Sequence, residues 1–119
     1  MRRLAPVLVL CAVACTSVLY VQQQCDTLYF GTARPDGTSV TDAEWQQFVH
    51  EVIEPRVPGF TQWNAQGEWR GKSEATHVVQ IIHPTREQPP IAQMIAEYKQ
   101  RFAQESVLHV RSIVWLRVR

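Results

Sequence analysis

The chain has 119 residues, of which 45% are hydrophobic and 19% charged, and its formal net charge is +1. This length leaves room for one domain, and the composition is that of a globular rather than a disordered protein. Without Arg2 and Arg3 of the N-terminal segment, ten basic residues face eleven acidic ones. A nearly neutral domain without a basic stripe gives no electrostatic basis for nucleic-acid binding.

The N-terminus has the layout of an export signal. Arg2 and Arg3 form a positive flank, and the following run from 4 to 20, LAPVLVLCAVACTSVLY, contains no charged residue. Small residues, Ala12 and Ala14, precede Cys15, and a cysteine directly after a cleavage point is typical of lipoproteins. We therefore predict a signal sequence over 1–14, lipid attachment at Cys15 and a tether over 15–26.

Two other interpretations remain open, because the apolar run continues past Cys15 as far as Val21. The 18 uncharged residues from Leu4 to Val21 approach the ~20 that span a bilayer, so residues 1–21 could stay as an uncleaved anchor. The protein could also be released as a soluble secreted form, or the run could be a buried structural helix. We predict export to the periplasmic side of the cell envelope, and the lipid and the uncleaved anchor both predict a membrane partner through the N-terminus. Cys25 can be free or can pair between chains.

Residues 27–119 are predicted to form a single α+β domain. Thr27 to Gly31 is rich in aromatic and β-forming residues and indicates a first strand. Thr41 and Glu44 have the spacing of a capping box, and the helix that they begin is expected to end before Pro55. Its apolar face recurs with helical spacing at Trp45, Phe48, Val49, Val52 and Ile53.

The remaining elements complete the pattern βαββαβ. Phe60 to Arg70 indicates a second strand with a bulge at Gly67, and the apolar run THVVQIIH at 76–83 indicates a central third strand. A second helix is expected after Pro89-Pro90, and a last strand over 107–118. This order predicts a ferredoxin-like plait, a four-stranded antiparallel sheet with two helices on one face.

The sheet face away from the helices is expected to be open. We place Ile113 and Trp115 of the last strand on that face beside Arg111, as a candidate interface for a homodimer or a protein partner. Shielding of these side chains by a loop or by the tether is the alternative explanation.

A candidate pocket is expected where strand and helix ends meet. It would contain Arg56, Glu68, Trp69 and Glu74, although structural ion pairs would produce the same pattern. The sequence identifies no catalytic residue, because it has no nucleophile elbow and Cys25 has no recognisable activating base.

Histidine spacing gives no metal site. His50 is followed at i+4 by Glu54, not by the second histidine of a zinc-protease helix. His77 and His83 are six residues apart on one strand, roughly 20 Å in an extended chain, and cannot share an ion. We therefore predict neither a metal nor a cofactor.

Five segments in order resemble one family of bacterial exported proteins and lipoproteins, grouped as domain of unknown function 3574. The resemblance spans about residues 27–118 and implies an envelope location and a compact α+β domain, but no activity. It also implies one cysteine before the first strand and another in the last. Cys25 matches the former, whereas Trp115 or a neighbour stands in place of the latter. The segments are LYFG at 28–31, the helix containing Trp45, PRVPGFT at 55–61, AQGEWR at 65–70 and YKQRFAQESV at 98–107.

These observations together predict a non-catalytic binding or interaction module of the cell envelope. The alternative is a small periplasmic enzyme that uses a pocket near Arg56, Trp69 and Glu74, which rests on the fold alone.

Overall fold

The computed structural model describes residues 19–118. The predicted signal sequence over 1–14 and the predicted lipid-attachment residue Cys15 lie outside this range. None of the helices within 19–118 is long and apolar enough to cross a membrane. The elements in chain order are β1 (Val21–Gly31), α1 (Asp42–Phe48), a π-helical continuation η1 (Val49–Ile53), β2 (Thr61–Trp69), β3 (Lys72–His83), α2 (Ile91–Phe102) and β4 (Leu108–Leu116).

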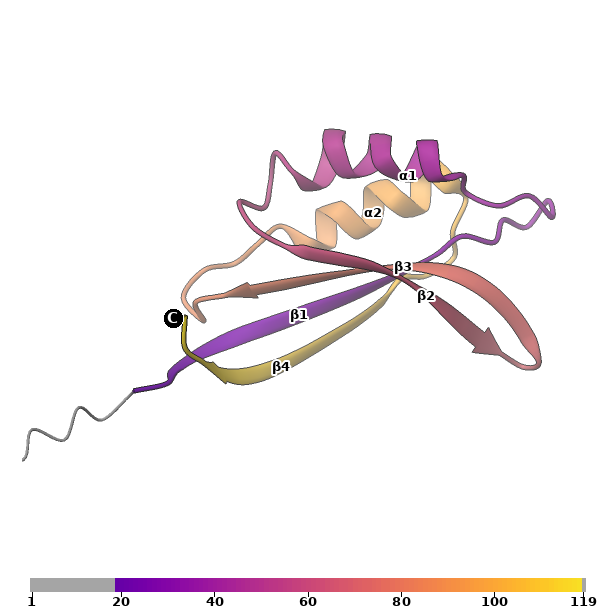
Figure 1. The fold of residues 1–119 in the computed structure, drawn as a ribbon. Coiled ribbons are helices and arrows are strands. Elements are labelled where there is room, and N and C mark those ends of the chain that lie inside the picture. Colours follow the sequence, from indigo (N-terminus) through magenta and orange to yellow (C-terminus); the bar gives the residue numbers. More distant parts are fainter. Residues whose placement is uncertain (1–18, 119) are drawn as a thin grey trace, which may run out of the picture.

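The four strands form one sheet in the order β2-β3-β1-β4, and every neighbouring pair is antiparallel. Both helices lie on the same side of this sheet (Figure 1). The predicted ferredoxin-like plait is therefore confirmed. Strands β1 and β3 occupy the centre, and β2 and β4 are the two edges.

The first helix begins as its capping box predicts. The Thr41 hydroxyl accepts a hydrogen bond from the Glu44 backbone N–H at 3.1 Å, and the Glu44 carboxylate bonds back to Thr41. This pair satisfies amide groups that would otherwise have no partner in the first helical turn. The helix continues through η1, and the apolar face predicted from Trp45 to Ile53 is buried.

The hydrophobic core lies between the helices and the central strands. Leu28 and Phe30 of β1 and Val79 of β3 share one sheet face and pack beneath the helices. The Phe30 ring centroid is 5.3 Å from that of Trp45 and 4.7 Å from that of Tyr98. Tilted aromatic pairs at such distances add to the stabilisation from burial alone.

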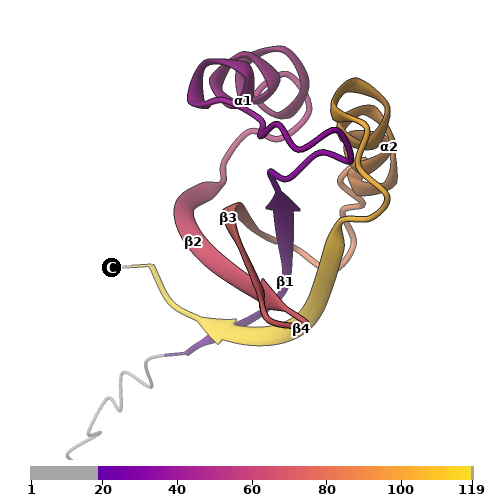
Figure 2. The ribbon, with the colours of Figure 1, turned by 90° about the vertical axis from the view of Figure 1, so that its right-hand side faces the viewer.

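On the sheet face away from the helices, side chains at the margins are exposed and side chains at the centre are buried. Figure 2 shows the edge strands β2 and β4 bending away from the helices. Cys25 and Val78 lie in the middle of this face, yet both are buried. Trp63, Ile82 and Val110 surround them and remain at least 42% exposed.

Two boundaries differ from the sequence prediction. The structure starts β1 at Val21, so residues 21–26 belong to the sheet rather than to the predicted tether, because they pair with β4 from Val21↔Leu116 onward. The predicted bulge at Gly67 is wrong, since β2 and β3 pair without interruption from Thr61↔Gln80 to Trp69↔Lys72.

The turn between β2 and β3 also explains the earlier start of β3. Arg70 and Gly71 both have positive φ, 50° and 76°. Positive φ at both central residues is the geometry of a type I′ turn, whose twist matches that of the flanking strands. The hairpin therefore closes in two residues, and β3 begins at Lys72.

Candidate functional site

A groove of about 640 Å³ opens on the sheet face away from the helices, at the end where β1 finishes and the β2–β3 hairpin turns. Apolar walls come from Tyr29, Trp69 and Leu108. The Trp69 side chain is 73% exposed, and the Arg70 guanidinium lies 5.5 Å from the centroid of its ring. The charged residues of the lining are Arg34, Glu68, Lys72, Glu74 and Glu105.

Glu74 lies at the floor of this groove between two glycines. A β-carbon on Gly31 would come within 2.7 Å of the Glu74 carboxylate. One on Gly67 would come within 3.1 Å of the Thr76 hydroxyl. The missing side chain at Gly31 therefore leaves the room beside β1 that the Glu74 carboxylate occupies, and the one at Gly67 leaves room beside the Thr76 hydroxyl.

The two oxygens of the Glu74 carboxylate have different surroundings. Its Oε2 accepts the backbone N–H of Ala33 at 2.9 Å, which fixes the side chain to the loop after β1. Within residues 19–118, no donor contacts the other oxygen, Oε1. A positioned carboxylate oxygen beside an exposed indole suits a ligand that carries both a cationic donor and a flat apolar group.

Ala33, Arg34 and Pro35, in the loop that follows β1, form one wall of the groove, and Arg34 holds this loop in place. The Arg34 guanidinium donates to the Ser39 carbonyl oxygen at 2.9 Å and is paired with the Glu44 carboxylate. Its Cζ also lies 5.6 Å from the centroid of the Phe102 ring. The loop is thereby connected to the N-terminus of α1 and the C-terminal end of α2.

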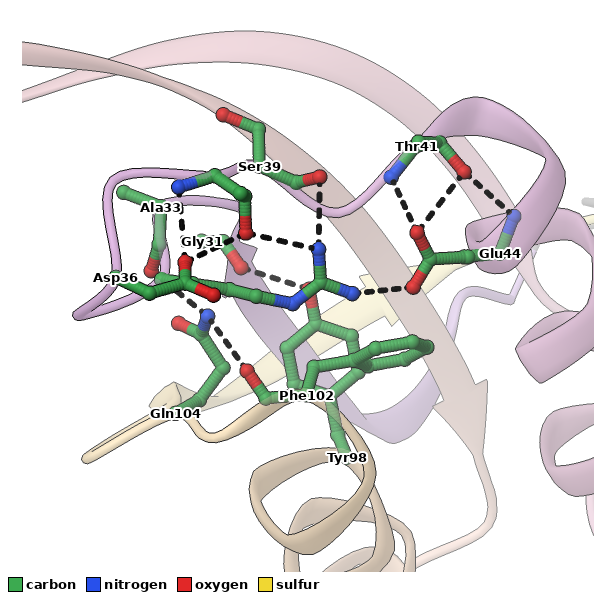
Figure 3. A network of polar contacts seen from close by, with 11 residues as sticks. Gly31, Ala33, Asp36, Ser39, Thr41, Glu44, Tyr98, Phe102 and Gln104 are labelled. Atoms are coloured by element: carbon green, nitrogen blue, oxygen red, sulfur yellow. Dashed lines mark hydrogen bonds and ion pairs between the residues drawn. The ribbon is translucent and has the colours of Figure 1, made fainter.

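Two further hydrogen bonds connect the same wall to α2 (Figure 3). The Tyr98 hydroxyl donates to the Gly31 carbonyl oxygen at 2.7 Å. The Gln104 amide donates to the Ala33 carbonyl oxygen at 2.8 Å. Burial raises the pKa of Tyr98 well above its ordinary value, so this hydroxyl stays a donor. The groove wall is therefore connected to α1 through Glu44, to α2 through Tyr98 and to the segment after α2 through Gln104.

A second polar cluster lies on the sheet face that carries the helices. Its members surround one carboxylate, that of Asp26. The Asp26 side chain is 0% exposed. Its Oδ1 accepts from Arg111 Nε at 2.8 Å and contacts His109 Nε2 at 2.7 Å, and its Oδ2 contacts His83 Nε2 at 2.6 Å. We call these four residues, from β1, β3 and β4, the Asp26 cluster.

His83 faces an oxygen at each of its ring nitrogens. Its Nδ1 lies 2.8 Å from the Pro84 carbonyl oxygen, and its Nε2 faces the Asp26 carboxylate. The ring is thereby fixed between β1 and the residue that follows β3. The buried Asp26 carboxylate and the Arg111 guanidinium form an ion pair.

Burial of Asp26 opposes its ionisation, but the hydrogen bonds from Arg111, His83 and His109 outweigh burial. They hold the pKa of this carboxyl well below its ordinary 3.8. Asp26 is therefore a carboxylate at any physiological pH.

The stability of the protein is expected to fall at acidic pH in a way that depends on Asp26. Because the folded pKa is lower than the unfolded pKa, the carboxylate contributes fully above about pH 5, and its contribution falls progressively as pH drops below about 4 toward the lowered folded pKa. Urea unfolding of the wild type and of Asp26→Asn from pH 6 to pH 3 should show curves that converge toward acid. Parallel curves would contradict this assignment.

Of the four predicted pocket residues, the structure brings three together. Glu68, Trp69 and Glu74 line the groove, but Arg56 does not. Arg56 follows η1, where it donates to the Val52 carbonyl oxygen at 2.9 Å and to the Glu97 carboxylate at 3.0 Å. Its inclusion in the pocket was wrong, because this guanidinium closes the C-terminal end of η1 against α2.

The predicted interface residues occupy a different sheet face from the one expected. Arg111 pairs with Asp26, which shares its face with Leu28, so Arg111, Ile113 and Trp115 all lie on the side that carries the helices. Ile113 and Trp115 are exposed there. The expectation that they line the open face is therefore wrong.

Cys25 is a free thiol and 5% exposed. Its neighbour across β4 is Ser112, which lies on the same face. Ser112 is therefore the residue at the place where a cysteine in the last strand would face Cys25, and Trp115 is on the opposite face. Within residues 19–118, no three histidine, cysteine, aspartate or glutamate side chains are placed to hold a metal ion.

The sequence profile of the family described as "Protein of unknown function (DUF3574)" matches residues 25–117. The chain belongs to the DUF3574 family. No curated protein matches the chain. Among solved structures, the DUF3574 chain is similar to a putative PII-like signaling protein from Thermus thermophilus, with 18% identity, 82% of this chain and 90% of that chain covered, and a TM-score of 0.37.

The DUF3574 match includes both polar centres described above. It begins at Cys25, next to Asp26, and ends after Arg111, so all four residues of the Asp26 cluster lie inside it. The groove residues from Tyr29 to Leu108 do so as well. Sequence reasoning grouped Glu68, Trp69 and Glu74, but it missed the rest of the groove lining and the Asp26 cluster.

Proposed function

We propose that this DUF3574 protein is an exported module, attached to the cell envelope by its N-terminus, that binds a small ligand without transforming it. The single observation that supports ligand binding is the Glu74 carboxylate, which the Ala33 N–H positions in a groove that the exposed Trp69 also lines. Export is supported by the uncharged run over 4–20 and by Cys15.

The chemistry of the groove suggests a ligand class. Three carboxylates, Glu68, Glu74 and Glu105, line it together with Tyr29 and Trp69, against two cations, Lys72 and the Arg34 that is paired with Glu44. Carboxylates attract ammonium groups, and aromatic faces attract cations and flat apolar groups. We therefore propose a ligand with an amine on an aromatic or similarly flat body. The groove contains no nucleophile paired with a base, so binding accounts for it better than catalysis.

Phenethylamine is a suitable first probe, because it carries one ammonium group and one phenyl ring. Weak binding, with a Kd of about 1 mM, is expected for so small a molecule. Glu74→Gln should weaken it about tenfold by removing a charged hydrogen-bond partner, and Trp69→Ala should do the same by removing the aromatic wall. Chemical shifts of the protein during titration measure both effects.

Matched controls separate the groove from the rest of the sheet. Trp63 lies on the same face of the same strand but does not line the groove, so Trp63→Ala should leave the Kd unchanged. The neutral analogue 2-phenylethanol should bind more weakly than the amine. Equal affinity of wild type and Glu74→Gln for phenethylamine would exclude the proposed role of Glu74.

Export and attachment are tested separately by mass. In bacteria that express the full chain, the membrane fraction should contain a species that starts at Cys15 and carries added diacylglycerol. Cys15→Ser should abolish that species. A membrane-bound chain that retains residues 1–14 would instead support the uncleaved anchor, and a full-length chain in the cytoplasm would refute export.

A further inference from the structure

The strands β1 and β4 extend beyond the rest of the sheet at the end opposite the groove. Pairing of β1 with β3 begins at Gln24↔His83, whereas pairing with β4 begins at Val21↔Leu116. Residues 21–23 of β1 therefore pair with β4 alone. We call residues 19–23 and 113–118 the terminal ribbon. Figure 1 shows it projecting from the sheet where the chain enters, away from the β2–β3 hairpin.

Large apolar side chains of the terminal ribbon are exposed on both of its faces. Trp115 is 65% exposed and lies on the helix-bearing side, as does Ile113. Val21 lies on the opposite side and is 54% exposed. A small monomeric protein does not usually gather this much apolar surface without a partner. A second sheet packed on one face would cover only half of it.

The polar groups of the ribbon fit a lipid surface. Residues 19–25 and 112–118 contain no aspartate or glutamate. The Arg117 Cζ lies 5.5 Å from the centroid of the Tyr20 ring. Tryptophan, tyrosine and arginine are the residues that anchor proteins at the boundary between headgroups and acyl chains, and arginine also favours anionic lipids.

The chain itself brings this end of the domain to a membrane. Five residues separate Cys15 from Val21, and a fully extended chain of that length spans roughly 20 Å. We propose that the terminal ribbon rests in the headgroup region of the bilayer that holds the N-terminus, with Tyr20 and Trp115 as interfacial anchors. This inference depends on the proposed attachment, and it orients the groove away from the lipid.

Quenching by brominated lipids tests the contact. Full-length protein purified from bacterial membranes is incorporated into vesicles of phosphatidylethanolamine and phosphatidylglycerol, with or without bromine on the acyl chains near the headgroup. Tryptophan emission of the wild type should fall in the brominated vesicles. Trp115→Phe should lose the quenched component. Trp69→Phe, which removes a similarly exposed indole at the opposite end of the sheet, should retain it.

Flotation of the vesicles distinguishes the two ways in which the inference can fail. Protein that does not float refutes both the attachment and the lipid contact. Protein that floats, but whose emission is the same in brominated and ordinary vesicles, refutes the lipid contact alone. If Trp115 is then also protected from acrylamide in the aqueous phase, a second protein chain covers the ribbon instead. Quenching that Trp115→Phe leaves intact overturns the assignment to Trp115.

Discussion

Asp26→Asn is expected to lower the free energy of unfolding by about 3 kcal/mol or more, because it breaks a buried ion pair from one side. His83 is 5% exposed and would face a neutral amide in place of the carboxylate. Arg111 and His109 would lose the charge that attracts them. Urea unfolding at pH 7, followed by tryptophan fluorescence, measures the change.

Two other substitutions serve as controls for this prediction. Asp36→Asn removes a carboxylate from an exposed turn, where it accepts hydrogen bonds from the nearby Thr38, and should change the stability far less than Asp26→Asn. Arg111→Gln removes a half-exposed partner of Asp26 and should cost less than the loss of Asp26 itself. If Asp26→Asn were as mild as Asp36→Asn, the cluster would not be stabilising the sheet.

Ser112→Cys is expected to create a disulfide with Cys25 and to stabilise the domain by about 2–4 kcal/mol. Directly opposed residues in antiparallel strands have α-carbons roughly 4.5–5.5 Å apart, within the range that a disulfide bridges. The link would join β1 to β4 and close most of the domain into one loop. A disulfide that closes a large loop stabilises the folded state most, because it removes more conformational entropy from the unfolded chain.

Reducing agent and Cys25→Ser provide the comparison. The Ser112→Cys variant should unfold at a higher urea concentration when oxidised than when reduced. The double variant Ser112→Cys with Cys25→Ser should show no such difference. Mass measurement after alkylation counts the free thiols. Two thiols that stay reactive under oxidising conditions would mean that the strand pairing does not bring the two side chains together as described.

Local sequence patterns predicted the helices and the topology well. The capping box at Thr41 and Glu44 acts within a few residues, so its effect can be read from the sequence alone. The same holds for the helical repeat of apolar residues from Trp45 onward. Once two helices and four strands were placed in order, the rules of chain connection left few alternatives to the plait.

The Asp26 cluster could not be predicted, because it joins residues from three strands that are distant in the chain. One signal was available, however. Asp26 alternates in phase with Leu28 and Phe30, so a strand that began before Thr27 would have placed it on the buried face. A carboxylate at a buried strand position requires charged partners, and this requirement points to histidine and arginine on the neighbouring strands.

The face of Trp115 was predicted wrongly for a different reason. Alternation in β4 separated the two sets of side chains correctly, but it did not show which set faces the helices. β4 is an edge strand, and both of its faces remain largely exposed. Counting apolar residues therefore cannot distinguish the faces there, as it can in the central strands.

Because Val21 pairs with Leu116, the chain enters and leaves the described domain at the same place. Anything joined after residue 118 would start near Val21, at the end of the sheet opposite the groove. A fluorescent label meant to report on the groove therefore belongs in the Arg70-Gly71 turn. A label that must stay clear of ligand belongs after residue 118.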